Sequence, residues 1–218
     1  AKILVANDAE GAALDMPAGP SEVLVIADES ARPEFVAADL LAQAEHSGDA
    51  QVVLLTTSAS LADQVATETV AQMSRLDREQ TLQQAIQHCR IIVVDSLEMA
   101  FDVSNTYAPE HLIVQVAEAR RWLNRVRNAG SVFLGPWTPE TMGDYCSGTN
   151  HVLPTYGFAR AYSGLSLVDF MKRMTVQELS ADGLRDLGPT AISIAELEGL
   201  DAHANAVQVR LRELGAST

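Results

Sequence analysis

The sequence predicts an α/β fold: a Rossmann-like, mostly parallel sheet with helices on both faces, followed by a C-terminal helical arm. Two observations carry this prediction. From residue 22 to residue 134, short apolar runs rich in β-branched residues alternate with segments of helical spacing, which is typical of a parallel sheet. After residue 190, two helical patterns follow each other with no strand between them.

The strands and helices of the core are predicted in chain order. Apolar runs with the composition of buried strands occupy residues 23–27, 52–56, 91–94, 112–116 and 131–134. Between them, apolar residues recur at helical spacing in five groups: Phe35, Ala38, Leu41 and Ala42; Leu61, Val65, Val70 and Met73; Leu82, Ala85 and Ile86; Leu97, Ala100 and Val103; Ala119, Trp122, Leu123 and Val126. Pro33 suits the first turn of the first helix, and Ser96 is the expected N-cap of the fourth.

The pattern breaks after residue 134. Glycines and prolines punctuate residues 135–156, so we expect a loop in which no regular element runs far, and a loop of this length is usually functional. Helical patterns then cover residues 191–200 and 202–214, with Asp201 as the expected N-cap of the second. We therefore divide the chain into an incomplete Rossmann-like domain, residues 1–165, and a C-terminal extension with a helical arm, residues 166–218.

Composition excludes several classes of function. Lys and Arg total 15 against 29 Asp and Glu, a net charge of −14, which argues against binding nucleic acid or an anionic membrane surface. No apolar run approaches the roughly 18 residues of a membrane span. Two isolated cysteines, Cys89 and Cys146, favour a reducing cytoplasm. The first residue is not Met and leads straight into an apolar segment, so we expect a piece of a longer protein.

Phosphate-binding and hydrolase motifs are absent. No G-x-G-x-x-G follows a strand, and there is no Walker loop, G-x-S-x-G or H-E-x-x-H. A nucleotide site would therefore be unusual or lie outside this chain.

Gln43 and His46 form the first candidate constellation. They stand three residues apart at the end of the first helix and so share a face. An imidazole and a second donor at this spacing can form half of a zinc site. The alternative is a polar helix end, in which His46 in the last turn interacts with the helix dipole.

Glu110 and His111 form the second constellation. Pro109 favours an extended backbone at Ala108, and the pair then stands at the start of a buried strand, at a sheet edge. A carboxylate beside an imidazole supplies two proton acceptors of different pKa, as a two-step oxidation or a hydrolysis requires. The alternative is a solvated Glu110 with His111 capping the strand.

Two further pairs are candidates. Asp144 and His151 lie in the polar loop, whose glycines give backbone freedom around a carboxylate; an ordinary surface loop is the alternative. Glu198 and His203 lie where the two C-terminal helices meet. In the first turn of a helix the dipole keeps His203 neutral, as a metal ligand must be, whereas a capped surface helix is the alternative.

Taken together, these stretches resemble the C-terminal half of the histidinol dehydrogenase family. The matching segments are Gly19-Pro-Ser-Glu22, Ala42-Gln-Ala-Glu-His46, Tyr107-Ala-Pro-Glu-His111, Gly143-Asp-Tyr-Cys-Ser-Gly-Thr-Asn-His-Val-Leu-Pro154 and Arg173-Met-Thr-Val-Gln177. The resemblance implies an NAD- and zinc-dependent oxidation of L-histidinol to L-histidine through an aldehyde, by a cytoplasmic homodimer with shared sites. Most of the site would then belong to residues 1–165, and the arm would serve dimerisation.

The resemblance also implies roles for individual residues. The zinc ligands would be Gln43, His46, Asp144 and, across the dimer, His203. Glu110 and His111 would be the proton acceptors. Residues around the substrate would be Ser21, His151 and Glu198, together with the four metal ligands and His111. No NAD-binding residue maps onto this chain, because the family carries most of that site in an N-terminal half.

Two alternatives to the histidinol-oxidising enzyme remain open. The chain could be a non-catalytic, zinc-binding, dimerising module, or part of a relative that oxidises a different primary alcohol. Glu198 and His203 match the imidazole-binding version of the family, which favours histidinol.

Overall fold

The computed structural model describes residues 2–17 and 19–216. The chain divides into two compact units, Ala1–Phe170 and Met171–Thr218, close to the boundary expected after residue 165. Each unit is described by itself below.

The first unit is built on a five-stranded, all-parallel sheet with strand order β3-β2-β1-β4-β5. Its strands are β1 (Glu22–Ala27), β2 (Gln51–Thr56), β3 (Arg90–Val93), β4 (His111–Gln115) and β5 (Ser131–Leu134). All five lie within one residue of the predicted boundaries. The predicted α/β fold class is therefore confirmed. Every residue of β1 and β4 is buried, because these inner strands are covered on both faces.

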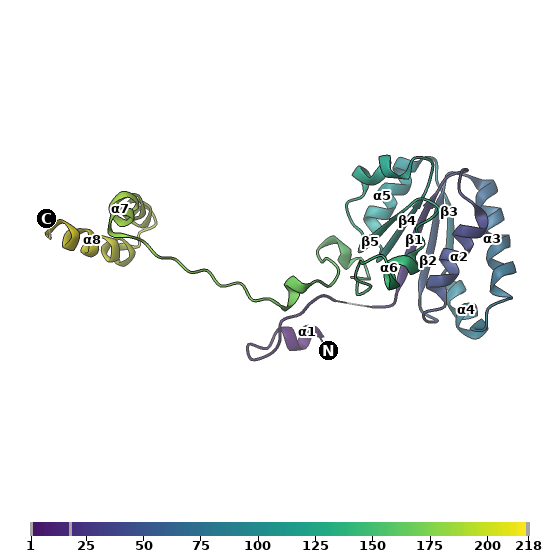
Figure 1. Ribbon diagram of the computed structural model, residues 1–218, viewed down its shortest axis with the longest axis horizontal. Coiled ribbons are helices and arrows are strands. Elements are labelled where there is room, and N and C mark those ends of the chain that lie inside the picture. Colours follow the sequence, from purple (N-terminus) through teal and green to yellow (C-terminus); the bar gives the residue numbers. More distant parts are fainter. Residues whose placement is uncertain (1, 18, 217–218) are drawn as a thin grey trace. The chain divides into compact units, whose positions relative to one another are not determined.

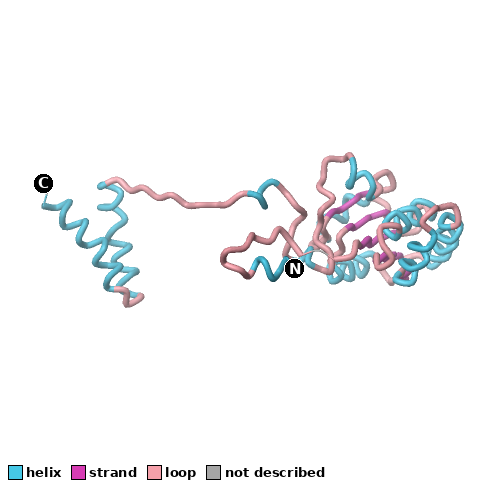
Figure 2. Tube along the Cα trace, turned by 90° about the horizontal axis from the view of Figure 1, so that it is seen from below, coloured by secondary structure: helices cyan, strands magenta, loops and turns pink. Residues whose placement is uncertain are grey.

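Helices cover the two faces of the sheet (Figure 1). On one face lie α2 (Pro33–Ala44) and α3 (Ala59–Met73), with α4 (Glu79–Ala85) and the short 3₁₀ helix η1 (Ile86–His88) nearby. On the other face lies α5 (Leu97–Tyr107). The alternation of β1 explains this arrangement: Val23 and Val25 pack in the core beneath α2, whereas Leu24 and Ile26 pack in the core beneath α5. Figure 2 shows the strands as one layer between helical segments.

Local sequence signals set the helix starts. Pro33 is the first residue of α2, where its missing N–H costs nothing. The hydroxyls of Ser58 and Ser96 accept hydrogen bonds from the N–H groups of Leu61 and Met99. The predicted N-cap at Ser96 is confirmed.

Two local predictions in the first unit are wrong. Ala108 is left-handed (φ 57°, ψ 65°) instead of extended, because it terminates α5 by donating its N–H to the Ser104 carbonyl at 2.7 Å. The segment after β4 forms a 3₁₀ helix, η2 (Ala119–Arg125), instead of an α-helix. It tightens a short connection in which the Trp122 ring stacks on Phe101, with centroids 5.3 Å apart.

The predicted loop contains one short helix. α6 (Glu140–Tyr145) interrupts it, and the 3₁₀ turns η3 (Phe158–Arg160) and η4 (Leu167–Phe170) follow. A further short helix, α1 (Lys2–Ala6), precedes the sheet. No long element runs through residues 135–156, as expected. The segment is not a loop throughout, however, because it contains α6.

The second unit is a pair of helices, α7 (Ala181–Leu197) and α8 (Asp201–Ala216). α7 begins ten residues before the predicted position 191, because Ser180 caps it and the helix continues through Pro189. Gly188 lets α8 pack closely: a Cβ there would lie 3.0 Å from Leu211. Asp201 is the first helical residue instead of the N-cap. Among the described helices, none has both the length and the hydropathy needed to cross a bilayer.

Candidate functional site

The candidate site lies at the amino ends of the parallel strands. His111 is the first residue of β4, Glu22 is the first residue of β1, and the two strands pair directly. Ligands of open α/β sheets usually bind at the opposite, carboxyl edge. The amino edge is where the C-terminus of α2 arrives after crossing the sheet, and the partial negative charge of a helix C-terminus favours cations.

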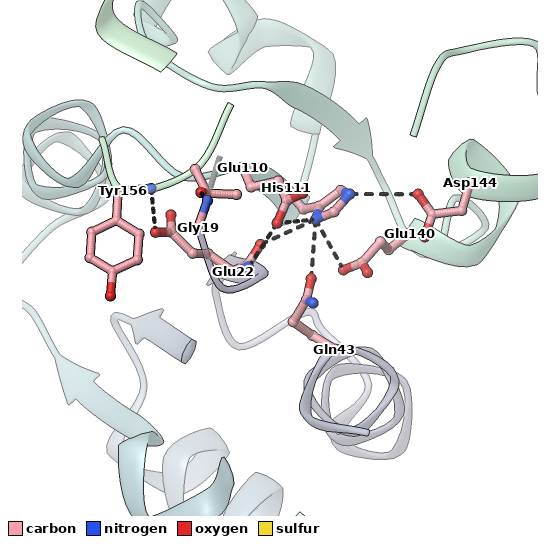
Figure 3. A network of polar contacts seen from close by, with 9 residues as sticks. Gly19, Glu22, Gln43, Glu110, His111, Glu140, Asp144 and Tyr156 are labelled. Atoms are coloured by element: carbon pink, nitrogen blue, oxygen red, sulfur yellow. Dashed lines mark hydrogen bonds and ion pairs between the residues drawn. The ribbon is translucent and has the colours of Figure 1, made fainter. Parts of the chain in front are cut away.

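The His111 imidazole is the centre of this cluster (Figure 3). It is 3 % exposed, and its Nδ1 lies 3.1 Å from the carbonyl oxygen of Glu22. If Nδ1 carries the proton and donates it to that carbonyl, Nε2 keeps a free lone pair. Nε2 has no hydrogen-bond partner among the described residues and lies 3.6 Å from an Asp144 oxygen. Burial lowers the pKa of His111, which keeps the ring neutral and able to accept a proton.

Glu110 lies beside His111 and is also buried. Its Oε2 accepts a hydrogen bond from the Glu22 N–H at 2.8 Å and lies 3.7 Å from His111 Nδ1. Burial, supported by the nearby carboxylates of Glu22 and Asp144, raises the pKa of Glu110 to about 8. The pKa values of the two groups are thus displaced in opposite directions, and Glu110 accepts a proton only in its ionised form.

The end of α2 supplies an amide and a second imidazole. Gln43 is fully buried in the last turn, with its carboxamide 3.1 Å from His111 Nδ1. His46 follows the helix, which ends at Ala44, instead of lying in its last turn as predicted. The His46 N–H nevertheless continues the turn by donating to the Gln43 carbonyl at 3.2 Å.

Two carboxyl groups reach the cluster from α6, spaced one turn apart: Glu140 and Asp144. Glu140 Oε2 lies 3.8 Å from His111 Nδ1. The chain after β5 passes the start of α2, where the Trp137 and Phe35 rings meet edge to face at 5.8 Å. α6 then packs against α2 and β5, and a Cβ at its Gly143 would lie 2.5 Å from the Phe133 ring.

The carboxyl groups of this cluster lack a cationic partner among the described residues. Burial and the neighbouring carboxylates of Asp144, Glu110 and Asp39 raise the pKa of Glu140 to about 9, and burial also raises the pKa of Glu22. In the part of the chain that the structure describes, no Lys or Arg forms an ion pair with Glu22, Glu110, Glu140 or Asp144. A bound cation would balance these carboxylates.

The donor atoms present fit a zinc ion. One ligand atom each from His46, Glu140 and Asp144 can be chosen so that all lie within 4.8 Å of one another. Imidazole nitrogen and carboxylate oxygen are common zinc donors. His111 Nε2 is buried and has no hydrogen-bond partner among the described residues. It lies 3.6 Å from an oxygen of Asp144, which is one of these three residues.

The structure does not bring every predicted residue to this cluster. Ser21 precedes β1, and its carbonyl accepts the Gln51 N–H at 3.0 Å. His151 is exposed, and no hydrogen bond or ion pair joins it to the cluster within the described residues. Glu198 ends α7 and His203 lies in the first turn of α8, both exposed within the second unit. Their predicted roles in the site stay predictions.

Two buried carboxyls were not among the predicted site residues. Glu22 was named only as the last residue of the Gly19-Pro-Ser-Glu22 motif. A buried acidic residue at the start of a strand is unusual and could have indicated a role in the site. Glu140 was missed because its segment was taken as a loop. Its spacing of four residues from Asp144 places both on one face once the segment is helical.

A pocket of about 830 Å³ adjoins the cluster at Glu22. Its other walls include Gln51, Met99, Val103, Tyr107 and Tyr156. Glu110, His111 and the candidate metal ligands near α2 and α6 do not line this pocket. The candidate site is therefore defined by the geometry of these side chains and not by the pocket.

Comparison with known proteins points to one family. The family model described as histidinol dehydrogenase matches residues 1–211. A histidinol dehydrogenase of Aliivibrio fischeri is 60% identical over 98% of this chain and 49% of its own length, and one of Legionella pneumophila (strain Paris) is 56% identical over 99% and 50%. A crystal structure of histidinol dehydrogenase from Elizabethkingia anophelis superposes with a TM-score of 0.91 at 51% identity, covering 94% of this chain and 47% of that one. The chain thus spans about half the length of the relatives it matches.

Proposed function

The chain belongs to the histidinol dehydrogenase family, and we propose that it supplies the zinc-binding and proton-accepting part of an enzyme that oxidises L-histidinol to L-histidine. The observation that carries this proposal is the His111 imidazole, whose Nδ1 is held by the Glu22 carbonyl while Nε2 has no partner among the described residues. A buried, neutral imidazole with one free nitrogen is suited to take the proton of an alcohol.

The two acceptors divide the proton chemistry between two oxidation steps. His111 Nε2 takes the hydroxyl proton as the alcohol is oxidised. Glu110 takes a proton from the water that adds to the aldehyde-level intermediate, since only the second step consumes water. The contact between Glu110 Oε2 and the Glu22 N–H at 2.8 Å holds this carboxyl in one orientation.

The family and the donor set support the bound groups that we propose. Gln43, His46 and Asp144, with His203 of the second subunit, would hold one zinc ion per site. When bound, zinc would fix the imidazole and amino nitrogens of histidinol, and NAD would accept the hydride. Ser21, His151 and Glu198 would contact the substrate. We place most of the NAD site in the half of the family's length that this chain does not span.

A second candidate is a zinc-binding, dimerising module without its own activity. It is favoured by the coverage, since the chain spans about half of its relatives. A relative that oxidises another primary alcohol is a third candidate. In each case we propose a cytoplasmic homodimer with shared sites.

NADH formation separates these candidates. The chain is assayed with histidinol, alone and together with the N-terminal half of the Aliivibrio fischeri relative. We expect zinc in the chain alone and NADH only when both halves are present, with His111→Asn as the inactive control. Zinc without NADH in an associated pair of halves would support the module, and NADH from another alcohol in preference to histidinol would support the third candidate.

A further inference from the structure

One orientation of the Gln43 carboxamide satisfies its carboxylate and carbonyl neighbours. One end of this fully buried group lies 3.0 and 3.2 Å from the two carboxylate oxygens of Glu140, 3.2 Å from the Glu22 carbonyl oxygen and 3.1 Å from His111 Nδ1. A carboxamide oxygen can only accept, and its nitrogen can only donate. When Glu140 is ionised, as a cation bound beside it would keep it, the nitrogen must occupy this end and the oxygen must point away from Glu140.

Glu140 is the neighbour that fixes this orientation. The Glu22 carbonyl lies 3.1 Å from His111 Nδ1 and can accept a proton from that nitrogen, so it does not by itself require a donor from Gln43. Both Glu140 oxygens lie within hydrogen-bond distance of the same amide nitrogen, and the residue is 2 % exposed. Turning the amide over would set its oxygen against two carboxylate oxygens in a buried site.

We infer that Glu140 is a positioning residue, whose carboxylate holds the Gln43 nitrogen and thereby presents the Gln43 oxygen as a metal ligand. This inference rests on the proposed zinc site, in which Gln43 is a ligand and Glu140 is not. Glu140 acts through Gln43, in the manner of the hydrogen-bonded partners that orient metal ligands in other proteins.

Zinc affinity measured in the full chain by competition with a chelator tests the inference. In Glu140→Gln, the new amide can donate to the Gln43 oxygen, so the Gln43 nitrogen turns toward the metal and cannot bind it. We expect zinc to bind about 10- to 100-fold more weakly, the usual effect of losing such a partner. In a Gln43→Ala background, Glu140→Gln should cause no further loss.

A reciprocal exchange keeps the test decisive if Glu140→Gln folds poorly. Gln43→Glu combined with Glu140→Gln preserves one carboxylate and one carboxamide, and the new carboxylate offers an oxygen in either orientation. We expect this double variant to bind zinc within about threefold of the starting protein. Glu118→Gln is the control and should leave zinc affinity unchanged, because Glu118 is exposed and pairs with Arg121 away from the cluster.

The outcomes are distinct. Unchanged zinc affinity in Glu140→Gln, or an equal further loss in the Gln43→Ala background, would overturn the inference. An unmodified chain that binds no zinc would overturn the zinc site of the proposed function instead.

Discussion

At the residue scale, Glu110 and His111 are adjacent, and we propose that they act in different steps. The carboxyl is buried with its pKa raised to about 8, and the pKa of the imidazole is lowered. In the complete enzyme, Glu110→Gln should slow the aldehyde-to-acid step about 10²- to 10⁴-fold, and the alcohol step much less. His111→Asn should slow the alcohol step as well. Rates measured separately with histidinol and histidinal check this.

Glu118→Gln is the control for these variants, because Glu118 is exposed and pairs with Arg121 away from the cluster. It should leave both rates unchanged. Equal slowing of both steps by Glu110→Gln would contradict the division of roles.

Asp39 gives a prediction about stability. Burial raises its pKa from 3.8 to about 7, although the Gln115 amide donates to it at 2.6 Å. Between these pH values the folded chain keeps a proton that the unfolded chain has released, so the free energy of unfolding falls as pH rises from about 4 to 7. Asp39→Asn removes this dependence, and its amide can also donate to Gln115 Oε1, which has no partner among the described residues.

We therefore expect Asp39→Asn to be more stable than the parent at pH 8, by up to a few kcal/mol, with the advantage vanishing near pH 4. Urea unfolding at both pH values measures it. An advantage that is constant with pH would mean that Asp39 titrates normally.

The residue scale also shows how far the sequence predicts the site. Gln43, His46, Glu110, His111 and Asp144 were predicted, and the fold brings their side chains to one edge of the sheet. Glu140 could not be found from composition, because its role depends on a six-residue helix in a segment rich in glycine and proline. Ala108 was mispredicted because a helix-terminating turn outweighed the preference of a residue before proline.

At the element scale, α6 positions two cluster residues through one glycine. Gly143 lies against Phe133, whose ring atoms would be 2.5 and 2.7 Å from an added Cβ. Gly143→Ala should push α6 outward, carrying Glu140 and Asp144 with it, and overpacking of this kind costs about 1–3 kcal/mol. We expect weaker zinc binding in chelator competition and a lower unfolding temperature.

A smaller side chain at position 133 should restore zinc binding to the Gly143→Ala variant. Phe133→Leu combined with Gly143→Ala makes room for the methyl group, so zinc affinity should recover. Ser96→Ala serves as the stability control, since losing the N-cap of α5 costs about 1 kcal/mol without moving α6. Zinc affinity that is equally reduced in the control would show a general loss of stability.

Element boundaries were predicted best where one physical signal dominates. The five strands are buried apolar runs, and their predicted limits hold to within one residue. α7 begins ten residues earlier than predicted, and it runs through Pro189, where Gly188 packs closely against α8. Propensity alone could not reveal that contact, since it is made by a separate helix.

At the scale of the whole molecule, the second unit leaves apolar surface uncovered. On α8, Val207 and Leu211 lie against Gly188 of α7, so they do not by themselves require a partner. On α7, however, Leu187, Ile194 and Leu197 are 60%, 53% and 88% exposed. A two-helix unit of this size is marginal alone, and these side chains gain from burial. We expect a second copy of the protein to cover them and His203 to enter that copy's site.

A mixing experiment tests this exchanged arrangement. One protein carries His203→Ala and the other His46→Ala, and each alone should bind less zinc than the unmodified dimer. If each site takes His46 from one chain and His203 from the other, the mixed dimer has one site with both defects and one with neither. That species should therefore recover full-affinity zinc at about half of its sites, measured by elemental analysis after the heterodimer is isolated with two different affinity tags. If each site instead lies within one chain, every site of the mixed dimer keeps one defect and nothing is recovered. The absence of any full-affinity site would therefore exclude exchange of the helical arm.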